Sequence, residues 1–174
     1  MSRAVGSGGG LVPAVGLTWQ RSWVLAAAGL LVVIGGLLAL YWGTALSMGE
    51  IWWRSETYAH GFVVVPLSLY MIWTRREALG RLSPRPAYWP LLPLALLGAG
   101  WLLADLVDVA VARQLALVAM IILAVVAMLG TRLAAMMAFP LAYLFFAVPM
   151  GGDLEPVLMD FTTVFTVDML RLTG

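Results

Sequence analysis

The sequence predicts an all-α fold: a polytopic integral membrane helix bundle with about five transmembrane helices and a C-terminal interfacial helix. Of its 174 residues, 63% are apolar and only 11% are charged, whereas soluble domains carry about 25% charged residues. Mean hydropathy is +0.97, and apolar runs alternate with short polar loops along the chain. We therefore expect a lipid bilayer to be the solvent for most of the surface.

Composition also limits the chemistry. The chain has no cysteine, which excludes a disulfide, a thiolate metal site and a thiol nucleophile among these residues. The net charge is +1 and no basic stripe is present, so a nucleic-acid partner is not expected. No motif implies a cofactor or a metal, and we expect neither.

The chain divides into three regions. Residues 1–20 are rich in glycine and predict a disordered cytoplasmic tail. Residues 21–152 predict the transmembrane helix bundle. Residues 153–174 predict an extracytoplasmic, interfacial, amphipathic helix, in which Asp153 caps the start and Pro156 fits the first turn. Four acidic residues in that segment argue against a further span.

Five apolar runs predict the spans: residues 23–44, 58–73, 89–104, 115–129 and 133–148. The first is long enough to cross roughly 30 Å of hydrocarbon. A polar segment, residues 47–60, separates it from the second, which stops at Arg75 and Arg76. The fifth is expected to kink at Pro140, because proline removes one hydrogen bond from the helical ladder.

Arginines predict the orientation. With a cytoplasmic N-terminus, most arginines lie inside, and the acidic residues except Glu77 lie outside, as the positive-inside rule requires. The arginines inside are Arg3, Arg21, Arg75, Arg76, Arg81, Arg85 and Arg132, and those outside are Arg54, Arg113 and Arg171.

Polar residues that could carry chemistry gather in residues 51–62, on the predicted outer face. His60 is the only histidine, and it suits either a proton carrier or a residue that caps a helix or hydrogen-bonds a neighbouring loop. Spacing alone favours the second role, because no clustered partner completes a catalytic set. Trp52 and Trp53 are interpreted as interface anchors. Asp105 and Asp108 are either a carboxylate pair or, as we favour, part of a solvated outer loop.

Two blocks of sequence resemble a known family. The first is Thr57-Tyr58-Ala59-His60-Gly61-Phe62, followed by Pro66 and Ile72-Trp73-Thr74-Arg75-Arg76. The second runs from Phe139-Pro140-Leu141 through Phe146-Ala147-Val148-Pro149 and Leu158-Met159-Asp160-Phe161-Thr162 to Leu170-Arg171-Leu172-Thr173-Gly174. In this order they resemble exosortases, and the exosortase A branch in particular, over residues 51–174.

The resemblance implies a bacterial inner-membrane, multi-pass cysteine protease or transpeptidase. Its substrates would be proteins with a C-terminal sorting signal made of a Pro-Glu-Pro motif, a membrane helix and a basic tail. Their processing would be linked to exopolysaccharide production and protein export. In the family, the nucleophilic cysteine and the active-site arginine follow the segment that matches Gly174, so we expect the front part of an exosortase, inactive alone. No catalytic residue is carried over.

Supporting roles at the extracytoplasmic mouth are expected for His60, Tyr58, Glu56 and Arg54. The alternative function is a non-catalytic multi-spanning component of polysaccharide export or assembly, which would also explain the missing cysteine. A small-solute transporter is disfavoured, because none of the predicted spans carries an ionisable residue at mid-membrane.

Overall fold

The computed structural model describes residues 14–150 and 155–173. All regular structure in these ranges is helical, as the sequence predicts. The helices are α1 (Ala14–Leu40), α2 (Trp42–Arg54), α3 (Gly61–Thr74), α4 (Arg76–Gly80), α5 (Leu91–Leu106), α6 (Ala110–Leu129), α7 (Thr131–Met136), α8 (Ala138–Tyr143), the 3-10 helix η1 (Leu144–Ala147) and α9 (Glu155–Thr173).

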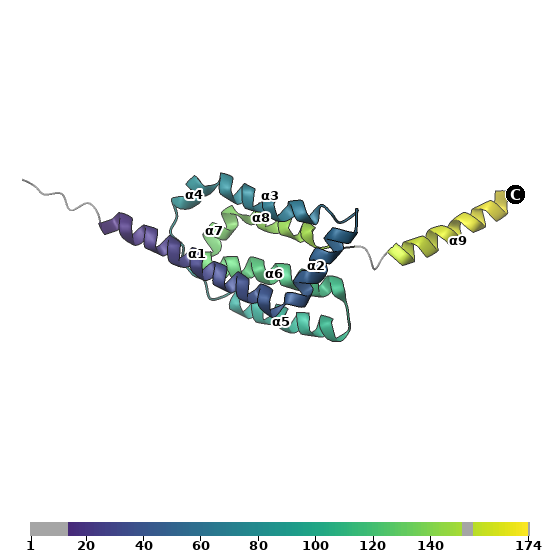
Figure 1. Cartoon of the computed structure of the whole chain (residues 1–174), viewed down its shortest axis with the longest axis horizontal. Helices are drawn as coiled ribbons and strands as arrows, with labels where there is room; N and C mark the ends of the chain where they lie inside the picture. The colour runs from purple at the N-terminus through teal and green to yellow at the C-terminus, as the bar shows by residue number, and fades with distance from the viewer. Residues whose placement is uncertain (1–13, 151–154, 174) are drawn as a thin grey trace, which may run out of the picture.

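Helix α6 lies at the centre of the bundle and contacts α1, α2, α5, α7 and η1. Figure 1 shows α3 beside α8, with α5 on the other side of α6. Two clusters of buried residues fill the interior. One gathers Leu79, Val125, Leu129, Leu133, Ala134, Met137 and Leu141, and the other gathers Met48, Val64, Val118, Ala147 and Val148.

Two helical segments are long and apolar enough to cross a bilayer, Ser22–Leu40 and Ala110–Leu129. The other apolar helices are shorter: Gly61–Thr74, Leu91–Leu106 and Ala138–Ala147. Helix α3 has 14 residues, which corresponds to about 21 Å of the roughly 30 Å hydrocarbon core. Five complete spans therefore stay a prediction. The large apolar side chains exposed on these helices suit a lipid environment, as on Leu31, Val32, Leu92 and Leu103.

The predicted boundaries of the first span are wrong. Helix α1 already includes residues 14–20, which were placed in the disordered tail, and it ends at Leu40 instead of Thr44. No helix-breaking pair interrupts the sequence after Pro13, which explains the early start. Residues 1–13 lie outside the described part of the chain.

A bend at Tyr41 separates α1 from α2. The hydrogen-bond ladder continues through it, from the Tyr41 N–H to the Leu37 carbonyl and from the Ala45 N–H to the Tyr41 carbonyl. The Tyr41 ring packs edge-on against Trp101, with 4.7 Å between centroids. Residues 47–54, which belong to the predicted polar segment 47–60, form the second half of helix α2, which buries Thr44 and Met48 on one face.

The predicted fifth span is interrupted. Helices α7 and α8 meet at Met137, just before Pro140. After α8 the chain continues as the 3-10 helix η1, which is more tightly wound than an α-helix. Proline at position 140 has no N–H to offer the Met136 carbonyl and its ring crowds the preceding turn. The predicted kink is therefore confirmed, with the break at Met137.

Helix α9 begins at Glu155, and Pro156 falls in its first turn as predicted. The proposed cap, Asp153, lies outside the described residues. All side chains described in α9, from Met159 to Arg171, are exposed. Its interfacial position stays a prediction.

The bundle has two chemically different ends. At one end α3 runs into α4 and α6 runs into α7 (Figure 1). We call it the arginine end, because it carries Arg75, Arg76, Arg81, Arg85 and Arg132. The other, the motif end, holds the α2–α3 and α5–α6 connections. The number of spans and their direction in the membrane stay predictions.

Candidate functional site

The two sequence blocks that resemble exosortases meet in space. Five side chains donate hydrogen bonds to, or lie within hydrogen-bond distance of, backbone carbonyls between residues 136 and 150. They come from α2, the α2–α3 connection, α3 and the residue that follows α3. The pairs are Arg75 with Met136, Ser68 with Pro140, His60 with Phe146, Trp52 with Ala147 and Tyr58 with Met150. We call this set the donor row.

The donor row follows from the irregular backbone opposite it. A regular helix uses its carbonyls internally, but Pro140 leaves the Met136 carbonyl without its usual partner. The Arg75 guanidinium donates to that carbonyl instead. Ser68, only 1% exposed, donates from Oγ to the Pro140 carbonyl over 2.6 Å. Inside a bilayer such side chains supply the hydrogen bonds that water cannot.

At the motif end, the chain leaves the helical ladder as η1 gives way to extended backbone at Val148. Trp52 Nε1 donates to the Ala147 carbonyl over 2.8 Å. The Tyr58 hydroxyl donates to the Met150 carbonyl over 3.1 Å. Trp52 is thus half-buried and hydrogen-bonded to Ala147, so it does more than anchor the chain at the membrane interface. Trp53 is 83% exposed, which suits that role.

His60 lies between two carbonyl groups. Its Nδ1 is 3.0 Å from the Thr57 carbonyl oxygen and its Nε2 is 3.2 Å from that of Phe146. Both partners are acceptors, so a neutral ring can donate to one of them and an imidazolium to both. The side chain therefore joins a neighbouring loop, which is the role that spacing favoured. Any role in chemistry stays a prediction.

Gly61 allows this arrangement. A Cβ at Gly61 would stand 2.4 Å from Nε1 of Trp52, the same atom that donates to Ala147. The indole also packs edge-on against Phe62, at 5.5 Å between centroids. The glycine next to His60 is thus required by close packing.

The other predicted site residues lie apart from the donor row. Arg54, at the end of α2, and Glu56, in the following turn, are both exposed. Neither forms an ion pair or a side-chain hydrogen bond with another residue in the described ranges. Their supporting roles stay predictions. Within those ranges, no group of three or more His, Cys, Asp or Glu side chains could hold a metal.

Asp105 and Asp108 share one cation. Arg113 donates to Asp105 over 2.7 Å and to Asp108 over 3.0 Å. The aspartates therefore join the end of α5 to the start of α6 and are not a free carboxylate pair.

Sequence reasoning missed a buried polar cluster beside this ion pair. Gln114 is 1% exposed, and its Nε2 donates to Ser47 Oγ over 3.3 Å. Ser47 donates to the Thr44 carbonyl, and Trp101 Nε1 donates to Thr44 Oγ1. The Gln114 Oε1 finds no hydrogen-bond partner among the residues that the structure describes. A single glutamine beside an apolar run was the available signal.

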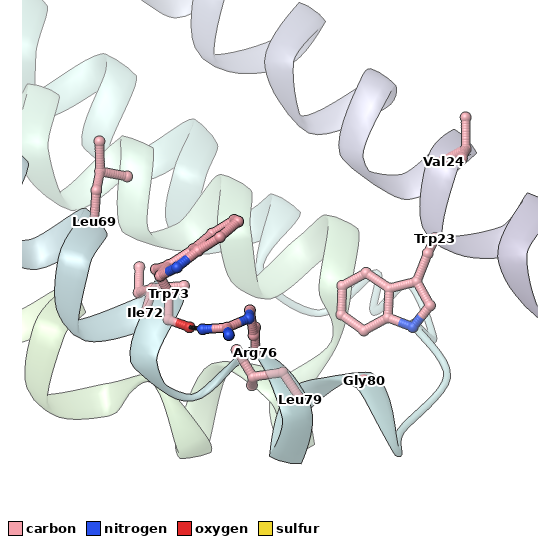
Figure 2. Close-up of a pocket in the computed structure, with 8 residues that line it drawn as sticks. All are labelled: Trp23, Val24, Leu69, Ile72, Trp73, Arg76, Leu79 and Gly80. Atoms are coloured by element: carbon pink, nitrogen blue, oxygen red, sulfur yellow. Dashed lines mark hydrogen bonds between the residues drawn. The ribbon is translucent and has the colours of Figure 1, made fainter.

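An apolar groove of about 750 Å³ opens at the arginine end, between α1 and the α3–α4 corner. Figure 2 shows Trp23 on one side and Trp73 with Arg76 on the other. The Arg76 guanidinium lies over the Trp73 ring, 5.0 Å from its centroid, and also donates to the Trp73 carbonyl. Trp23 Nε1 donates to the Leu82 carbonyl, which ties α1 to the α4–α5 connection.

Comparison with known proteins identifies one family. The family model described as transmembrane exosortase (Exosortase_EpsH) matches residues 52–174. The matched region begins at Trp52 and includes every member of the donor row and its carbonyl partners. No curated protein and no solved structure matches the chain.

Proposed function

Because the chain belongs to the transmembrane exosortase family, we propose that it forms the front part of a membrane cysteine protease or transpeptidase. Its substrates are proteins bearing a C-terminal Pro-Glu-Pro sorting signal, and its activity serves protein export and exopolysaccharide production. The enzyme lies in the bacterial inner membrane with its N-terminus in the cytoplasm and its motif end outside. Family membership and the resemblance of the two sequence blocks support this proposal.

The role of these residues is structural and substrate-facing. The chain has no cysteine, so none of its side chains is the thiolate that such chemistry requires. In a cysteine enzyme of this kind, the nucleophile is therefore not one of these residues. What the chain supplies is the donor row, which fixes the backbone of residues 146–150 against the Tyr58–His60 turn.

One observation carries the proposal: three side chains at the motif end bind the same short stretch of irregular backbone. Trp52 and Tyr58 donate to it and His60 lies in reach of it. Rigid support of this kind is what a catalytic site needs from its surroundings. Arg54 and Glu56, exposed beside it, are free to contact a substrate.

The test is chromosomal substitution, which leaves the rest of the gene product in place. Tyr58→Phe and His60→Ala are compared with Tyr88→Phe, a matched control because Tyr88 is 80% exposed and lies outside the donor row. Processing of a reporter with a Pro-Glu-Pro signal is followed by its change in mass. Slower processing in the first two variants, at normal protein levels, is expected.

Unchanged processing in both variants would contradict the assigned role of the motif end. The alternative, a non-catalytic component of polysaccharide export or assembly, predicts a different pattern, because no reporter processing depends on it. Under that alternative, deletion of the gene lowers exopolysaccharide export but leaves the mass of the reporter as it was.

A further inference from the structure

A second hollow lies at the arginine end, next along the chain from the α4 residues that line the groove of Figure 2. It measures about 340 Å³ and is walled by this connection and by the α6–α7 junction. Its polar lining includes Arg81, Ser83, Arg85, Thr131 and Arg132. We call it the arginine hollow. Nothing in the proposed enzyme activity uses it.

No acidic side chain in the described part of the chain neutralises the positive charge in the hollow. Arg81, Arg85 and Arg132 line it, and none forms an ion pair with an acidic side chain in the described ranges. Glu77, the acidic residue of this end, is exposed and does not line the hollow. Arginines gathered without a counter-ion bind phosphate groups well, since guanidinium and phosphate oxygens match in geometry.

Backbone hydrogen bonds offset part of the negative charge at the end of α6. Carbonyls at the C-terminal end of a helix such as α6 repel an anion. Here the Arg85 N–H donates to the Leu129 carbonyl over 3.2 Å and the Ala87 N–H to the Ala127 carbonyl over 2.9 Å. The same bonds hold the Arg85 segment against the end of α6.

Gly130 makes this contact possible. Its φ is +89°, and a Cβ there would stand 2.2 Å from the Arg85 carbonyl oxygen. The positive-inside tendency explains why arginines are frequent in such loops. It does not explain why three of them converge on one hollow built around a glycine that lets two segments touch.

We infer that the arginine hollow binds the phosphate headgroup of an anionic phospholipid. A lipid is favoured over a soluble phosphate because the hollow lies at the end of α6, one of the helices long enough to span the bilayer, where headgroups are found. Trp23, of a residue type that is enriched at membrane interfaces, donates a hydrogen bond to the carbonyl of Leu82, and Leu82 lines the hollow.

Native mass spectrometry of the purified chain in detergent, at about 0.15 M salt to screen long-range attraction, tests the inference. Phosphatidylglycerol is expected to stay bound at concentrations where phosphatidylcholine does not. Arg85→Gln and Arg132→Gln are each expected to weaken phosphatidylglycerol binding about tenfold, because each removes charge-assisted hydrogen bonds to phosphate.

Arg76→Gln is the matched control. It removes the same charge from the same end, but Arg76 stacks on Trp73 and lies outside the hollow, so binding should change by less than about twofold. Arg132→Lys keeps the charge but loses the planar guanidinium that matches phosphate, so binding should fall less than in Arg132→Gln. A folded, partly binding Arg132→Lys protein separates lost affinity from lost folding.

Other results would overturn the inference. Equal losses of phosphatidylglycerol binding in the Arg76, Arg85 and Arg132 variants would show that only the overall surface charge matters. Binding of phosphatidylcholine as tight as that of phosphatidylglycerol would show that the negative charge of the lipid is not recognised. Displacement of phosphatidylglycerol by millimolar inorganic phosphate would assign the hollow to a soluble anion.

Discussion

Helix α6 and the segment from α7 to Met150 are both apolar, are consecutive in the chain and pack together, yet they meet their hydrogen-bonding needs differently. Helix α6 is a continuous 20-residue helix that buries Leu117, Met120 and Ala124. Its carbonyls are used within the helix up to the last turn, where Ala127 and Leu129 accept from backbone N–H groups of the α4–α5 connection. The following segment is broken at Met137 and again after Ala147. Its free carbonyls are bound by the side chains of the donor row.

This difference indicates which side chains the fold requires at particular positions. A regular helix asks only for apolar neighbours, so many sequences suit α6. A broken helix in a bilayer leaves backbone carbonyls that need a hydrogen-bond donor, and that donor must lie directly opposite the break. Ser68, His60 and Tyr58 are thus fixed by the backbone opposite them, which explains why the distinctive sequence blocks are the ones that meet. The predictions below change one side of this contrast at a time.

The largest effect is expected in α6. Leu117→Ala removes a side chain that is 2% exposed and leaves a cavity, which should lower the free energy of unfolding by about 3 kcal/mol. Leu92→Ala is the control, because Leu92 is 70% exposed and should change little. Unfolding in mixed detergent micelles, followed by tryptophan fluorescence, measures both. Equal losses would show that α6 is not held by packing.

Gly61→Ala should cost about 2 kcal/mol through overpacking, because the new methyl group collides with the indole that binds Ala147. Gly43→Ala is its control: no atom lies within 4 Å of a Cβ there. That change in α2 should be neutral or stabilise by up to about 1 kcal/mol through helix propensity. If both alanines behave alike, the close approach of Trp52 to Gly61 is absent in solution.

Ser68→Ala should cost about 1.5 kcal/mol, since it strands the Pro140 carbonyl away from water. Thr74→Val is the comparison, because Thr74 is exposed and donates only to Met71 in its own helix. Thermal unfolding in detergent should separate the two variants. An equal shift in both would mean that the Ser68 bond adds nothing beyond a local one.

Sequence patterns predicted the two kinds of region unequally. The predicted runs 58–73, 89–104 and 115–129 correspond to α3, α5 and α6, because hydropathy reports apolar length directly. The donor row was not predicted. Its partners stand 61 positions apart for Arg75 and Met136, and 95 apart for Trp52 and Ala147, and no local period encodes such pairs. Nor does hydropathy reveal that α2 continues helically beyond Ser47.

Within the site, the resemblance drew attention to Tyr58 and His60, and both are in the donor row. Gln114 and Gly61 were missed as participants for a physical reason. A lone glutamine or glycine has a role only once its neighbours are known, and those neighbours, Ser47 and Trp52, come from another helix.

The smallest effect is expected for Arg75, and it tests whether this side chain replaces the hydrogen bond that Pro140 cannot donate. Arg75→Met keeps an unbranched apolar stem but removes the guanidinium that donates to Met136, which should cost about 1 kcal/mol. Pro140→Ala supplies a backbone N–H in the position from which a regular helix binds that same carbonyl. In the Pro140→Ala background, the Arg75→Met change should therefore cost almost nothing. A double-mutant cycle should give a coupling of about 1 kcal/mol. Simple additivity would mean that Arg75 does not replace the hydrogen bond that proline removes, and that the broken segment tolerates its free carbonyl for another reason.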